Sequence, residues 1–123
     1  MRRCCTVLIA AFLVGLVGCA TTLPPAQTVS DVKVLAGTYD GWISNPNGNF
    51  QAKLTVQPDG SYVGEGYRGG APVAGRIYLF NSQTRYESPT SKGTVTLHDG
   101  DGKRVLRFVR DDGSASGEFT PVK

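Results

Sequence analysis

The chain has 123 residues, of which 13 are basic and 10 acidic, giving a formal net charge of +3. This length favours one domain. All three cysteines precede residue 20, so the remaining residues contain no thiol. That excludes cysteine catalysis, a zinc ribbon and an internal disulfide from the body of the protein. Without Arg2 and Arg3 the balance is 13 − 2 = 11 basic against 10 acidic residues, a near-neutral charge that argues against nucleic-acid binding.

The first nineteen residues have the order of an export signal. Arg2 and Arg3 precede an uncharged apolar run over residues 4–18. As a helix this run is about 22 Å long, shorter than the roughly 20 residues that span a bilayer. It ends in Leu16-Val17-Gly18-Cys19, which resembles the lipobox of bacterial lipoproteins. The resemblance implies a signal peptide over 1–18, cleavage after Gly18 and lipid on Cys19. An uncleaved anchor, or cleavage at Ala20 or later, remains the alternative.

The residues after Cys19 bear on location and on the link to the folded body. Ala20 stands where an Asp would favour retention at the inner membrane, so the lipoprotein resemblance implies the outer membrane, facing the periplasm. Residues 20–30 carry no charge and no hydrophobic period. We therefore expect a lipidated, flexible tether over 19–34, with a root-mean-square span of about 22 Å, and a folded domain over 35–123.

Helix signals are confined to one short segment, and strand signals follow it. Ser30 is a fair N-cap for a helical turn over Asp31–Ala36. Phe50–Gln57 alternates apolar and polar residues without a fault, and Pro58-Asp59-Gly60 then predicts a hairpin turn. The other predicted strands are Thr38–Ser44, Ser61–Tyr67, Arg76–Asn81, Arg85–Glu87, Gly93–His98, Lys103–Arg110 and Ser114–Thr120.

Short, evenly spaced strands with hairpin connections predict an all-β antiparallel meander of seven or eight strands, with one helical turn near its start. Closure into a small barrel, complete or nearly so, removes exposed strand edges. The face of Lys103–Arg110 that points inward stays open. One turn length aligns Leu106 and Phe108 with Val95 and Leu97; another aligns Val105 and Val109 with Ala115 and Phe119. A bulge, or apolar residues on both faces of the strand, would reconcile the two. A spacing of 53 relates Asp59-Gly60-Ser61 to Asp112-Gly113-Ser114, through duplication or through shared turn chemistry.

Residues 37–67 carry a second resemblance. Gly37-Thr38-Tyr39, the alternating strand and the Asp-Gly turn are similar to the opening of calycin barrels, the avidins more than the lipocalins. The resemblance implies an up-and-down β-barrel. Tyr39 stands where an avidin has Trp, and Trp42 is the only tryptophan of the chain. The resemblance therefore implies the fold but not biotin binding.

Residue types that perform chemistry are present without the patterns that chemistry needs. His98 has no Gly-x-Ser-x-Gly elbow to partner it, so a solvated strand-end histidine is the better interpretation. Asp99-Gly100-Asp101-Gly102 begins like a calcium loop, but Lys103 and Arg110 fall at ligand positions. The three glutamates, Glu65, Glu87 and Glu118, have no fixed spacing. We predict no enzyme activity, no cofactor and no metal site.

The remaining hypotheses concern binding. Arg and Tyr are favoured in protein interfaces, and we assign a candidate interaction surface to Arg68, Arg85 and Tyr86, which flank the loops 69–72 and 88–91. The leading hypothesis is a non-enzymatic interaction module anchored to a membrane through Cys19, with an envelope protein or glycan as partner and inhibition of an envelope hydrolase as one form. The alternative is a carrier of a small apolar ligand inside the barrel.

Replacing Cys19 tests the anchor. In Cys19→Ser the acyl acceptor is lost, so metabolic labelling with palmitate should disappear and the protein should remain an uncleaved precursor or become soluble. Labelling and membrane retention equal to those of the unaltered protein would contradict the lipoprotein interpretation.

Overall fold

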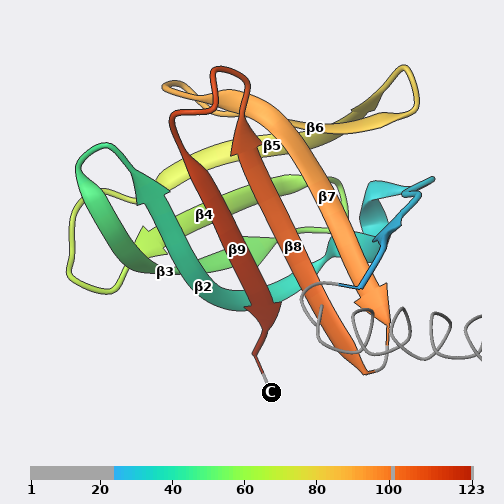
Figure 1. Cartoon of the computed structure of the whole chain (residues 1–123), viewed down its shortest axis with the longest axis horizontal. Helices are drawn as coiled ribbons and strands as arrows, with labels where there is room; N and C mark the ends of the chain where they lie inside the picture. Colours follow the sequence, from blue (N-terminus) through green and yellow to red (C-terminus); the bar gives the residue numbers. More distant parts are fainter. Residues whose placement is uncertain (1–23, 101, 123) are drawn as a thin grey trace, which may run out of the picture.

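The computed structural model describes residues 24–100 and 102–122. The expected signal peptide, Gly18 and Cys19 lie outside the described residues. The described part is a closed eight-stranded antiparallel barrel with one additional strand (Figure 1), which confirms the predicted all-β meander. No helix in this part is long and apolar enough to cross a bilayer. The elements are β1 Ala26–Gln27, η1 Val32–Leu35, β2 Gly37–Asn45, β3 Gly48–Val56, β4 Ser61–Gly66, β5 Val73–Phe80, β6 Gln83–Glu87, β7 Lys92–Gly100, β8 Lys103–Arg110 and β9 Ser116–Pro121.

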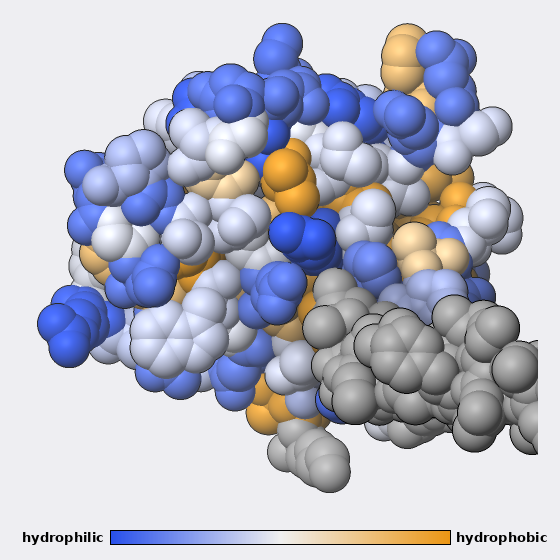
Figure 2. Space-filling view, in the orientation of Figure 1, coloured by the Kyte–Doolittle hydropathy of each residue, from blue (hydrophilic) through white to orange (hydrophobic). Residues whose placement is uncertain are grey.

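Consecutive strands from β2 to β9 are paired, and β9 returns to pair with β2, so that the circle is complete. The closing register runs from Tyr39 opposite Pro121 to Ser44 opposite Ser116. Closure leaves no free edge on these two strands. The visible outer wall is mostly hydrophilic, with hydrophobic colour mainly in recesses (Figure 2).

The junction between β6 and β7 is the shortest in the circle. It contains three residue pairs, from Arg85 opposite Thr94 to Glu87 opposite Lys92. On the outer wall Arg85 donates two hydrogen bonds to the carboxylate of Asp111, at 2.8 and 2.7 Å. Asp111 directly follows β8, so this bidentate ion pair ties β6 to the far side of β7, in the geometry that makes Arg–carboxylate pairs strongest.

The inward face of β8 is settled by its pairing with both neighbours. Gly100 pairs with Lys103, so β7 and β8 are joined by a tight turn, and Leu97 faces Leu106. Across β9, Leu106 faces Phe119. The alignment with Leu106 and Phe108 inward is therefore confirmed. The alternative inward face was wrong because β9 begins at Ser116, two residues later than expected, and the longer connection restores alternation without a bulge. Val105, on the other face of β8, is also buried, so this strand has buried apolar residues on both faces.

The 53-residue echo corresponds to one shared turn structure. Asp59 accepts hydrogen bonds from the backbone N–H and the hydroxyl of Ser61, and Asp112 does the same for Ser114. The glycine between them has a positive φ in both turns, 94° and 76°. Asp-Gly-Ser thus caps and closes the same kind of turn at both positions.

The segment expected as a flexible tether is, from Pro24 onward, part of the folded body. Ala26 and Gln27 pair with His98 and Leu97 of β7. Val29 is buried, and η1 confirms the helical turn. Its N-cap is Asp31, which accepts from the N–H of Lys33, and not Ser30 as predicted. The domain boundary expected at Leu35 is therefore too late in the chain, because apolar residues before Leu35 pack against the barrel.

η1 seals one end of the barrel. Leu35 is fully buried in the interior cluster. The hydroxyl of Tyr39 donates to the carbonyl of Leu35 at 2.7 Å, and Arg104 of β8 donates to the carbonyl of Val34 at 2.9 Å. Arg104 also pairs with Asp99 of β7 at 3.2 Å. We call this the closed end.

Leu35 and Val34 provide a matched test of this seal. Leu35→Ala removes a fully buried side chain and should lower the free energy of unfolding of residues 20–123 by about 2–5 kcal/mol. Val34, which is 47% exposed, should tolerate the same change to within about 0.5 kcal/mol. Urea unfolding measures both. Equally small losses would mean that η1 unfolds separately from the barrel.

Candidate functional site

The end of the barrel opposite η1 contains a pocket of about 420 Å³. Its walls come from the ends of the strands and from the three loops that join β4 to β5, β6 to β7 and β8 to β9. We call this end the mouth. Two of these loops were expected from the sequence to contact a partner. The loop 69–72 contributes Ala71 to the pocket lining, and the loop 88–91 contributes Ser88, Thr90 and Ser91.

The pocket adjoins inward positions of β3 and β4 that carry small residues. Along β3 the inward side chains run from Val56 and Leu54 to Ala52 and then Phe50, which also lines the pocket, and along β4 from Tyr62 to Gly64. A Cβ added at Gly64 would meet a single atom within 4 Å, the carbonyl oxygen of Val73 at 3.9 Å. The space beside Gly64 is therefore unfilled, whereas buried side chains fill the closed end.

The floor of the pocket is an aromatic cluster. Phe108 lies at its centre, with ring centroids 5.9 Å from Tyr62, 5.2 Å from Tyr86 and 5.7 Å from Phe119, all in edge-on arrangements. Such pairs stabilise by about 0.5–1.5 kcal/mol beyond the area they bury. The floor is thus rigid and apolar, separating the pocket from the filled closed end.

Glycines on neighbouring strands make room for the two tyrosines of this floor. Gly75 lies opposite Tyr62, and a Cβ there would come within 2.5 Å of the tyrosine ring. Gly93 lies opposite Tyr86, and a Cβ there would come within 2.8 Å of that ring. An aromatic ring over a cross-strand glycine is a recognised way to pin register in curved sheets. These glycines are functional positions that the strand pattern did not reveal.

The phenol groups of the floor add polarity without charge. The hydroxyl of Tyr86 hydrogen-bonds to that of Ser91 at 2.9 Å. Burial raises the pKa of Tyr62 to about 12, and interaction with Ser88 offsets part of this shift. The Tyr62 phenol is therefore neutral at physiological pH, and the floor can accept an apolar group without desolvating a phenolate.

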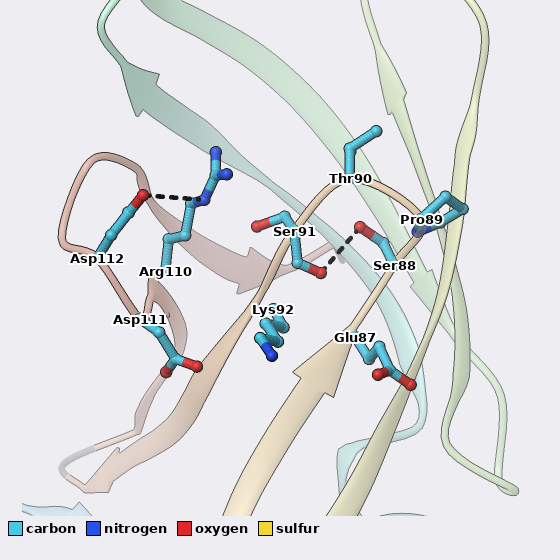
Figure 3. A pocket seen from close by; sticks show the side chains of 9 residues that line it. All are labelled: Glu87, Ser88, Pro89, Thr90, Ser91, Lys92, Arg110, Asp111 and Asp112. Carbon is cyan, nitrogen blue, oxygen red and sulfur yellow. Dashed lines mark hydrogen bonds and ion pairs between the residues drawn. The ribbon is translucent and has the colours of Figure 1, made fainter.

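A second hollow, of about 360 Å³, adjoins the pocket on its polar side (Figure 3). It is a groove between the β6–β7 loop and the segment Arg110–Asp112. Arg110 and the serines of the loop line both hollows. Arg110 forms an ion pair with Asp112 at 3.5 Å, Glu87 lies on the opposite side, and Lys92 lies between Asp111 and Glu87. The apolar pocket thus opens on a groove with charges of both signs.

The predicted interaction surface is not one surface. Arg68 is exposed in the β4–β5 loop, and Arg85 is on the outer wall, held by Asp111. Tyr86 is 7% exposed and lines the pocket. Successive residues of a strand point to opposite faces, so Arg85 and Tyr86 cannot serve one partner surface. The expectation that Tyr86 is exposed was wrong.

Three of the residues considered for chemistry, His98, Asp99 and Glu118, have structural partners. Nδ1 of His98 bonds the carbonyl of Pro24 at 2.9 Å, so this histidine docks the N-terminal segment and is not simply solvated. Asp99 pairs with Arg104, and Glu118 with Arg107 at 3.6 Å. Within residues 24–100 and 102–122, no three His, Cys, Asp or Glu side chains are grouped to hold a metal ion.

Comparison with known proteins adds no relative. No protein-family model, no curated protein and no solved structure matches the chain.

Proposed function

We propose that this chain is a lipid-anchored binding protein of the cell envelope that takes the apolar part of a small ligand into the mouth of its barrel. The observation that carries the proposal is the pocket of about 420 Å³ above an uncharged aromatic floor. Small-molecule sites are typically about 300–1,000 Å³, largely apolar, with a few polar groups at the opening. The mouth fits that description.

This proposal favours the carrier hypothesis over the Arg/Tyr interaction module. Tyr86 faces the pocket, and the guanidinium of Arg85 is already bonded to Asp111, whose pKa it holds below its usual value. The expected ligand is amphipathic, with an acyl chain or comparable apolar group inside and its polar end in the groove beside Arg110 and Lys92. No catalytic step is part of the proposal.

The same mouth supports one other use. The loops 69–72 and 88–91 rim the pocket, so an envelope protein that inserts one apolar side chain there would also be bound, as an inhibited hydrolase would. We propose the outer membrane, facing the periplasm, as the location, because Ala20 follows Cys19. The lipobox supports the lipid anchor.

Filling the pocket from Gly64 tests ligand binding. Gly64→Phe directs a ring into unfilled space and should weaken binding of a fluorescent fatty acid to residues 20–123 at least about tenfold, or ~1.4 kcal/mol. Val63→Phe is the matched control, because Val63 is 39% exposed on the outer face of the same strand. It should leave the affinity unchanged.

Fluorescence titration measures the affinity, and thermal unfolding checks that both variants are folded. The proposal fails if the probe does not bind, or if the two variants bind it equally well. Normal probe binding by Gly64→Phe with loss of a captured envelope protein would favour the inserted-side-chain alternative.

A further inference from the structure

Exposed apolar side chains gather at the closed end of the barrel. Phe80 is 60% exposed and Leu79 39%, both at the end of β5, which runs from Val73 at the mouth to the closed end. Val34 of η1 is 47% exposed. Val122 is also 47% exposed, and its N–H bonds the carbonyl of Thr38 just after η1. Figure 1 shows the C-terminus well apart from the β5–β6 hairpin, so Phe80 and Leu79 are the apolar side chains of the hairpin tip itself. Exposed apolar surface marks candidate interaction sites.

The β5–β6 hairpin carries the most exposed of these side chains beyond the barrel wall. The hydrophobic colour reaches its tip at the upper right of Figure 2. Asn81 and Ser82 form the turn with φ of 50° and 66°, the conformation of a tight two-residue hairpin. The residues from 77 to 84, Ile-Tyr-Leu-Phe-Asn-Ser-Gln-Thr, contain no charge. Exposed hairpin edges are usually protected by charged side chains, and here that protection is missing.

The described chain enters at this same end. The carbonyl of Pro24 is bonded to His98, and Pro24 lies against Gly100 at the end of β7. Cys19 is 24 − 19 = 5 positions earlier, a reach of at most about 18 Å. A lipid on Cys19 would therefore hold the closed end close to the bilayer. Charges of both signs lie in this region, among them Lys33, Lys103 and Asp31. We therefore expect the apolar side chains, and not net charge, to set the orientation of the barrel on the membrane.

We propose that the tip of the β5–β6 hairpin inserts Phe80 and Leu79 into the interfacial layer of the membrane that holds Cys19. This inference rests on the proposed lipid anchor and adds a second contact to it. Aromatic side chains prefer the interfacial layer, and a lipid chain together with an apolar contact anchors more firmly than either alone. The contact turns the closed end toward the bilayer and the mouth toward the aqueous compartment, where ligand enters.

The single tryptophan makes the orientation measurable. The full mature, lipidated protein is reconstituted into vesicles of phosphatidylethanolamine and phosphatidylglycerol, with and without bromine on the acyl chains. The F80W/W42F variant reports on the hairpin tip. The unaltered protein is the control, because Trp42 is 56% exposed on the outer wall of β2 and lies about 17 Å along that strand from Gly37 at the closed end.

In F80W/W42F the emission should shift to the blue on vesicles, and brominated lipid should quench it at least twofold more than it quenches the unaltered protein. Vesicle flotation is measured in parallel. Flotation without a shift or quenching overturns the hairpin contact and leaves the lipid anchor standing. A blue shift without bromine quenching means that the tip is buried against protein, such as a second copy, and also overturns it.

Loss of flotation overturns the anchor and the hairpin contact together. The ligand-binding proposal is separate from all three outcomes, because the fatty-acid titration of residues 20–123 does not require a membrane.

Discussion

Closure of the sheet between β2 and β9 determines how the interior of this protein can be used. Eight strands enclose a space that the chain must fill with side chains or leave hollow. This chain fills one half, with Leu35 at the end and Leu54, Leu106 and Ile77 around it, each at most 2% exposed. The other half contains the pocket, which lies beside the small inward residues Ala52 and Gly64 and is also lined by Ile43 and Phe50. Stability and a binding pocket are thus allotted to opposite ends of one barrel, with the Phe108 aromatic cluster between them.

The segment before the barrel connects the closed end to the residue proposed to carry the lipid anchor. It pairs with the part of β7 that β6 leaves uncovered, is held by His98, and continues into η1, which seals the closed end. Because the N-terminal segment reaches the barrel at its closed end, the mouth lies away from the proposed site of lipid attachment. The proposed lipid and the apolar hairpin tip therefore both belong to the closed end, and the mouth faces away from them.

Local sequence rules predicted the strands because each strand has one buried face and ends at a turn with clear chemistry. Phe50–Gln57 and the Asp59 turn are examples, and the observed strand β3 differs at its ends only. The same rules missed the pocket, since alternation marks an inward glycine such as Gly64 as a weak strand residue and not as a hollow. They placed Tyr86 outside because its strand is too short to show a period. They assigned residues 24–34 to the tether because β1 pairs with residues about 70 positions away.

The central claim is that an apolar ligand binds above the Phe108 cluster and nowhere deeper. Nuclear magnetic resonance of residues 20–123 with a spin-labelled fatty acid tests this directly, because the label broadens signals near the bound chain. We expect broadening at Ile43, Ala52 and Phe119, which line the pocket, and unchanged signals at Leu35 and Ile77 in the filled half. Broadening confined to the outer wall, or equal broadening at both ends of the barrel, would contradict the account.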